Sequence, residues 1–198
     1  MTAGDVLQAF ALPAGCQVDR RVPKTLWPDG LRAAVGGTVE ELRWLAVLKP
    51  GNAAVPATAD VAEIQFLGIR LRPGVKPPQV AERVQRAVPY AAVLLVEQGE
   101  ALALAAGGAF CDLGDDAVTR AWAAGLALAR QDRTSLGTLY AGWEGAVRRL
   151  GEPARLEQEM ARLRSRAAKE KRLAEVAEIN LRLQRLQSEF AAARAALG

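Results

Sequence analysis

The middle of the chain alternates between apolar and polar residues as a half-buried strand does. Residues 63–72 have this period of two, but its parity switches after Phe66. Ile69 and Leu71 would then face the other side of the sheet. One extra residue near Gly68 would return all of them to a common face, so the pattern predicts a β-bulge there.

A helical segment and two further strands follow. Residues 77–88 have apolar positions three or four apart, and Pro89 would end the helix that they predict. The strand-sized apolar runs 91–96 and 101–106 are joined through Gly99, which would supply the positive φ of a tight turn. The order strand, helix, strand, strand predicts an α+β fold, in which flanking helices cover a small mixed or antiparallel sheet.

Other segments of the first 150 residues differ in how clearly their pattern indicates a structure. We predict a short helix at 4–12 and a helical turn that leads into a strand at 42–48. A longer helix at 134–150 has its apolar residues on one stripe, with Thr134 or Ser135 as its N-cap. Residues 121–130 fit a helix or a strand, and their periodicity does not decide between the two.

The end of the chain predicts a long helix with a coiled-coil seam, and at the polar patch 168–172 this helix either bends or changes partner. Gly151 would end the preceding helix and Pro153 would begin the next. This divides the chain into an α+β globular domain at 1–151 and a C-terminal coiled-coil helix at 152–198. Apolar positions step alternately by three and four after residue 172, and a second helix must cover them. We expect this seam to dock a protein partner or a second copy through Val176, Ile179, Asn180, Leu183, Leu186 and Phe190.

Charge distinguishes the same tail from the rest of the chain. The formal net charge of +4 resides in residues 153–198, which contain ten Lys or Arg and six Asp or Glu. Two interpretations remain open: a solvated helix face, or a contact with phosphate groups. The candidate nucleic-acid-binding residues are Arg162, Arg164, Arg166, Lys169, Lys171 and Arg172.

Composition limits the chemistry that the chain can perform. It has no histidine, so catalytic triads and zinc sites that need an imidazole are excluded. Cys16 and Cys111 are far apart in sequence and outside any metal-binding spacing, which is typical of buried thiols in a reducing compartment. The N-terminus lacks the pattern of a signal peptide, and no apolar run reaches the roughly 18 residues of a membrane span. We therefore expect a cytoplasmic protein with no membrane contact.

One enzymatic alternative survives these limits. A Mg²⁺-dependent nuclease of the PD-(D/E)xK type uses two carboxylates to hold the metal and a lysine to stabilise charge on the phosphate. Pro28-Asp29 and Glu63-Ile64-Gln65 would imitate that pattern, with Gln65 at the lysine position. Losing the lysine's charge weakens the match, and ordinary polar residues on a solvent-facing surface are the competing interpretation.

Four stretches resemble an uncharacterised bacterial family, known as a domain of unknown function, that is often encoded beside helicases and DNA methyltransferases in restriction or phage-defence loci. They are DRRVPK at 19–24, EIQFLGIRL at 63–71, AVPYAAVLLVE at 87–97 and KEKRLAEVAEINLRLQRL at 169–186. The resemblance implies an accessory component, and the chain has no phosphate-binding loop and no methyltransferase motif. It implies no catalytic residue, cofactor or metal. We therefore expect a non-catalytic adaptor that docks a helicase or methyltransferase and has a possible contact with DNA.

Overall fold

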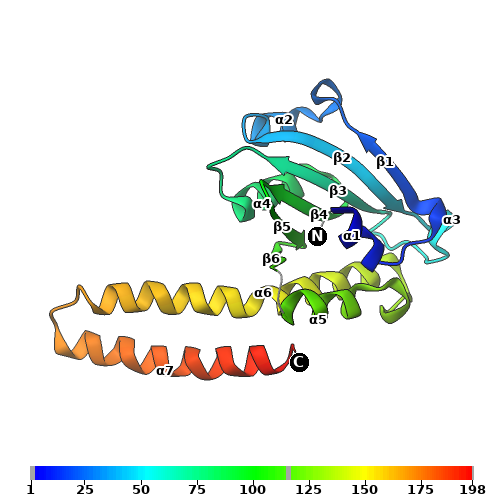
Figure 1. Cartoon of the computed structure of the whole chain (residues 1–198). Helices are drawn as coiled ribbons and strands as arrows, with labels where there is room; N and C mark the ends of the chain where they lie inside the picture. The colour runs from blue at the N-terminus through cyan, green and yellow to red at the C-terminus, as the bar shows by residue number, and fades with distance from the viewer. Residues whose placement is uncertain (1–2, 115–116, 198) are drawn as a thin grey trace.

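The computed structural model describes residues 3–114 and 117–197, whose strands form one six-stranded sheet (Figure 1). The strands follow chain order, and each neighbouring pair is antiparallel except β3 and β4, which are parallel. The strands are β1 Gln17–Arg21, β2 Val39–Leu48, β3 Ile64–Leu71, β4 Ala91–Gln98, β5 Ala101–Ala106 and β6 Ala109–Asp112. The helices are α1 Ala3–Ala9, α2 Asp29–Val35, α3 Pro50–Ala53, α4 Pro77–Ala87, α5 Ala117–Leu126, α6 Leu136–Ala167 and α7 Leu173–Ala195. The fold is α+β with a mixed sheet, as predicted.

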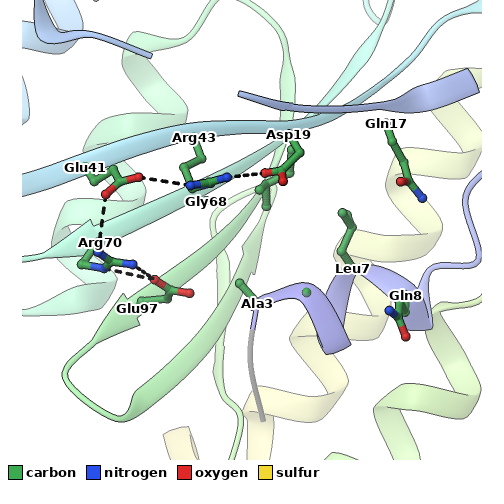
Figure 2. Close-up of a pocket in the computed structure, with 12 residues that line it drawn as sticks. Ala3, Leu7, Gln8, Gln17, Asp19, Glu41, Arg43, Gly68, Arg70 and Glu97 are labelled. Carbon is green, nitrogen blue, oxygen red and sulfur yellow. Dashed lines mark hydrogen bonds and ion pairs between the residues drawn. The ribbon is translucent and has the colours of Figure 1, made fainter. Parts of the chain in front are cut away.

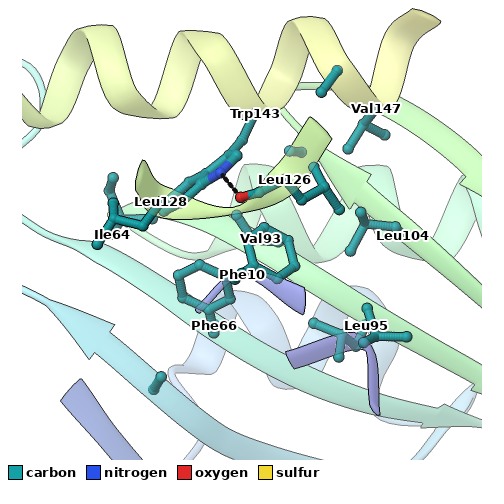
Figure 3. Packing of buried hydrophobic residues seen from close by; sticks show 14 of the residues in the cluster. Phe10, Ile64, Phe66, Val93, Leu95, Leu104, Leu126, Leu128, Trp143 and Val147 are labelled. Carbon is teal, nitrogen blue, oxygen red and sulfur yellow. Dashed lines mark hydrogen bonds between the residues drawn. The ribbon is translucent and has the colours of Figure 1, made fainter. Parts of the chain in front are cut away.

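One face of the sheet packs against α1, α5 and the first half of α6. Phe10, Phe66 and Trp143 meet there edge to face, with ring centroids 4.9–5.4 Å apart. The indole Nε1 of Trp143 donates a hydrogen bond to the carbonyl oxygen of Leu126 at 2.9 Å, which satisfies its buried polar atom (Figure 3). The stripe predicted for 134–150 is therefore the face of α6 that builds this core.

The opposite face of the sheet packs against α2 and α4. Leu31 of α2 and Trp27, which precedes α2, are buried there with Val80 and Val84 of α4. The indole of Trp27 donates to the carbonyl oxygen of Val22 at 3.0 Å. Because both faces are covered, the central strands β4 and β5 are apolar at nearly every position.

The bulge predicted at Gly68 was wrong, and the two covered faces explain why. β3 pairs with β4 residue by residue from Ile64 to Arg70 without interruption. Ile64 and Phe66 belong to the core under α6, whereas Ile69 and its neighbours of the same parity belong to the core under α4. The register shifts lie in β2 instead, where Leu45 is an extra residue opposite β3.

The predicted end of a helix at Gly151 was also wrong. α6 begins with the N-cap Ser135, whose Oγ accepts from the backbone N–H of Thr138, and continues through Pro153 to Ala167. Gly151 lies at a close approach to the sheet, because a Cβ there would collide with the carbonyl oxygen of Phe110 in β6. The glycine thus permits packing between helix and strand, and the expected boundary at 151–152 falls inside one continuous helix.

The C-terminal segment is not one unbroken helix, because residues 168–172, where the sequence predicted a bend or a change of partner, form a turn between α6 and α7. α7 returns antiparallel along α6, and the two make a helical hairpin that extends away from the sheet (Figure 1). A small apolar cluster of Leu156, Met160 and Leu186 joins them. The helix that must cover the seam is therefore α6 of the same chain.

The remaining predictions from the sequence were confirmed in part. β2 is extended from Val39 onward, so the helical turn expected before 42 is absent from it. Residues 121–126 are helical, as one of the two interpretations required. Gly99 has a φ of +58° between β4 and β5, as predicted for the tight turn. Among the described residues, no helix has both the length and the apolar character needed to cross a membrane.

Candidate functional site

The predicted basic residues gather at the free end of the hairpin. Arg162, Arg164 and Arg166 lie on the last turns of α6, and Lys169, Lys171 and Arg172 lie in or next to the turn. All six side chains are exposed. We call these six residues the basic tip. In the sequence these residues form an eleven-residue run, and in the structure the tight turn between α6 and α7 brings them together.

Ion pairing at the basic tip is incomplete. Arg172 pairs with Glu170 at 3.3 Å and with Glu175 at 2.6 Å. Within residues 3–114 and 117–197, no ion pair reaches Arg162, Arg164, Lys169 or Lys171. The turn therefore presents several uncompensated cations to solvent, which favours an anionic ligand.

Glu170 pairs with Arg172 and also holds the turn in place. Its carboxylate accepts hydrogen bonds from the backbone N–H groups of Lys171 and Arg172, both at 3.0 Å. The bond from the Arg172 backbone is the main cause that lowers the pKa of Glu170 below its usual value. The neighbouring Glu175 shares a hydrogen bond with Glu170, which raises the pKa of Glu175.

The predicted partner-binding seam faces α6. Ile179 and Leu186 are each 6% exposed, and Leu183 and Phe190 pack around the same cluster. Val176 is half-buried and Asn180 is exposed. The apolar seam is thus used within the chain, and a partner could take that face only by opening the hairpin.

Charged side chains also join the two helices of the hairpin. Arg182 of α7 donates to Glu159 of α6 at 2.6 Å, and Arg155 donates to the same carboxylate at 3.3 Å. Arg155 is held in turn by Glu152 at 2.6 Å. The hydrogen bond from Arg182 is the main cause that lowers the pKa of Glu159. This network fixes the register of the hairpin below the basic tip.

The residues of the nuclease hypothesis do not form one site. Asp29 starts α2, its side chain is 98% exposed, and it pairs with Arg32. Glu63 pairs with Lys49 at 3.1 Å and accepts from Gln65 at 2.7 Å. α2 leads into the start of β2, whereas Glu63 adjoins the strand pair at the end of β2. Among the described residues, no group of three or more Cys, Asp or Glu side chains could hold a metal ion.

A cavity on the sheet was not anticipated. It has a volume of about 430 Å³ and lies between α1 and the exposed part of the sheet. A chain of ion pairs crosses its floor in the order Asp19, Arg43, Glu41, Arg70, Glu97 (Figure 2). The hydrogen bond and the charge of Asp19 together raise the pKa of Arg43, so this pair is firmly engaged.

Each of these five side chains is paired, although three carboxylates and two guanidinium groups leave a net charge of −1, so a ligand would first have to displace a partner. One signal in the sequence pointed to the cavity: Gly68 and Arg70 have the same parity as Ile64 and Phe66. The mistaken bulge concealed it, because it would have turned Arg70 to the opposite face. The basic tip, with its uncompensated cations, is therefore the stronger candidate site.

Comparisons with known proteins concern the sheet rather than the hairpin. No curated protein and no solved structure matches the chain. Residues 10–109 match a family described as Domain of unknown function (DUF4391). The match includes β1 to β5 with α2, α3 and α4, and it ends before α6. Because it covers half of the sequence, the protein belongs to the DUF4391 family.

Proposed function

We propose that this protein is a non-catalytic accessory subunit of a DNA-targeting bacterial defence or restriction system, and that its basic tip binds the phosphate backbone of nucleic acid. The sheet domain, which extends from α1 to the first half of α6, holds the hairpin, and the hairpin makes the contacts. The exposed, unpaired cations of the basic tip are the observation that carries this proposal.

Position and pairing both favour the basic tip over other charged surfaces. Its turn is the part of the hairpin farthest from the sheet, so a long polyanion can reach it without meeting the globular domain (Figure 1). Arginines lower on the hairpin, such as Arg155 and Arg182, are engaged by carboxylates. Phosphate contacts need cations that are not already neutralised.

The resemblance to a family encoded near helicases and DNA methyltransferases supports the choice of partner. A helicase or methyltransferase would bring the protein to DNA, and the basic tip would add a contact that is independent of base sequence. Because the seam is covered by α6, docking would use the exposed faces of the hairpin or the sheet domain. These exposed surfaces take the place of the seam, which was the docking site expected from the sequence.

A direct binding assay tests the nucleic-acid contact. The full chain is titrated into a labelled DNA duplex at about 0.1 M salt, and fluorescence anisotropy is recorded. The test variant replaces Arg162, Arg164, Lys169 and Lys171 by alanine, and leaves Arg166 and the paired Arg172 in place. Each phosphate contact contributes about 0.9 to the slope of log K against log salt. The loss of four contacts should therefore lower the affinity at about 0.1 M salt by at least about 100-fold.

A matched control removes the same charge elsewhere. Arg83, Arg120, Arg130 and Arg133 are exposed on the sheet domain and make no ion pair within the described residues. Their replacement by alanine should leave affinity within about threefold. Equal losses in the two variants would mean that net charge alone attracts DNA, and would refute the assignment to the basic tip.

A further inference from the structure

The outer face of α7 has a second heptad pattern. Its positions step by four and three along the helix: Ala174, Glu178, Leu181, Arg185, Ser188 and Ala192. At about 100° per residue this face lies well away from the seam that packs against α6. Leu181 lies at its middle with 59% of its surface exposed.

A groove runs beside this face. It has a volume of about 720 Å³ and lies between α6 and α7. Its apolar lining includes Leu163, Leu181 and Leu186. Its charged lining is balanced, with four cations and four anions: Arg155, Arg166, Arg182, Arg185, Glu159, Glu175, Glu178 and Glu189. A neutral, mixed-charge groove with apolar residues fits an amphipathic helix rather than nucleic acid.

Within the described residues, four of these charges make no ion pair, Arg166, Arg185, Glu178 and Glu189, and two of the four are symmetrically placed. Glu178 and Arg185 make no ion pair in the part of the chain that the structure describes. They lie about one helical turn on either side of Leu181. A two-fold axis beside Leu181 would therefore bring Glu178 of one copy to Arg185 of another, and Arg185 to Glu178.

We propose that the groove binds a second copy of this chain, with the two hairpins antiparallel in a four-helix bundle. The contact is isologous: Leu181 packs near Leu181 of the second copy, and two Glu178–Arg185 ion pairs flank it. The same face supplies both halves of the complementarity. Because the pattern is complementary to itself, a second copy is the occupant that it favours.

The length of α7 agrees with this arrangement. The helix runs from Leu173 to Ala195, so an axis beside Leu181 or Arg182 lies close to its centre. Each basic tip would then reach the level of the other copy's last helical turn. The two α7 helices would then overlap along most of their length.

One consequence rests on the proposed function. Lys169 lies about 12 residues from the axis, which places the two basic tips roughly 35–40 Å apart at about 1.5 Å per residue. One turn of B-form DNA is about 34–36 Å. A dimer would therefore present its two basic tips to one duplex about a helical turn apart.

Exchanging the charges at positions 178 and 185 tests for the dimer in the absence of DNA. The mass of the full chain is measured by light scattering after size exclusion, from about 1 to 100 µM, with circular dichroism as a check of folding. The wild type should be a dimer at the upper concentrations. Glu178→Arg and Arg185→Glu should each be monomeric, because like charges then face each other in both ion pairs.

Mixing the two variants supplies the decisive result. In a 1:1 mixture, the arginine introduced at position 178 of the first variant faces the glutamate introduced at position 185 of the second. The native Arg185 of the first variant likewise faces the native Glu178 of the second, so a dimer should re-form. The double variant should also dimerise, because its exchanged charges are again complementary.

A control and two contrary outcomes complete the test. Glu157→Arg, at an exposed site outside the groove, should behave as wild type. A wild type that is monomeric at about 100 µM, or a mixture that stays monomeric, would overturn the proposal. A dimer that fails to bind DNA would refute the proposed function and leave this inference intact.

Discussion

The sheet domain and the hairpin are held together by different means. The sheet domain has an extended apolar core on each face, with Trp143 and Phe66 fully buried in one of them. The hairpin has a cluster of three buried residues, of which Leu186 is α7's contribution. Ion pairs such as Arg182–Glu159 supplement that cluster. Apolar burial fixes the first region, whereas the second depends on a thin core and on charge.

This difference indicates which region makes contacts. Buried side chains cannot also bind a partner, and the charged side chains in the cavity beside α1 are paired with one another. The hairpin exposes unpaired cations at its tip and an apolar residue, Leu181, on its outer face. Few buried contacts also make a segment easier to open locally than the core it projects from. The following predictions test this contrast, beginning with the largest effect.

Replacing Trp143 by alanine should destabilise the sheet domain most. The change removes a fully buried ring, its edge contacts with Phe10 and Phe66, and the hydrogen bond to Leu126. We expect the free energy of unfolding to fall by about 3–5 kcal/mol, measured by denaturant titration. Leu26→Ala is the control, because Leu26 is 68% exposed. Similar losses in the two variants would contradict the core described here.

Replacing Leu186 by alanine should loosen the hairpin and leave the sheet domain intact. Leu186 is 6% exposed between the two helices. A loss of about 2 kcal/mol or more is expected in the local stability of α7, seen as faster amide hydrogen exchange. Leu173→Ala, at a residue that is 86% exposed, should change exchange little. Faster exchange in β4 as well would mean that the two regions unfold together.

Acid should have the smallest of these effects on the hairpin, through Glu159. The hydrogen bond from Arg182 and the charge of Arg155 hold the pKa of Glu159 below its usual value of 4.5. A carboxylate whose pKa is lower in the folded state stabilises it above the unfolded pKa, and this contribution disappears as pH falls through the folded pKa. Exchange in α7 should therefore quicken below about pH 4.5 and, once corrected for the intrinsic exchange rate, stay level from about pH 5 to 7. Glu159→Gln should flatten this dependence; an unchanged profile would exclude Glu159 as its source.

Much of the sheet domain could be predicted because its signals are local. The turn at Gly99, the N-cap Ser135 and the stripe that includes Trp143 each depend on a few neighbouring residues. The bulge failed because parity was interpreted for one buried face, whereas α4 and α6 bury both. Only tertiary packing reveals that β3 contributes Phe66 to one core and Ile69 to the other.

The hairpin shows the same limit more strongly. The apolar seam at Ile179 and Leu186 was predicted, but its partner is α6, and sequence does not distinguish a helix in the same chain from one in another. A glycine such as Gly151 is typical of a helix end, but here a glycine is required because β6 lies close to α6. The basic tip was predicted as a charge run; its place at the end of a hairpin needed the turn at 168–172.

The salt dependence of DNA binding tests the central claim most directly. The slope of log K against log salt counts the cations that contact phosphate, at about 0.9 per contact. The wild type should give a steep negative slope. Removing Arg162, Arg164, Lys169 and Lys171 should reduce its magnitude by about 3–4 units, and removing the four control arginines should leave it unchanged. If the variant at the basic tip kept the slope of the wild type, the phosphate contacts would lie elsewhere and the account of the hairpin as the contact region would be wrong.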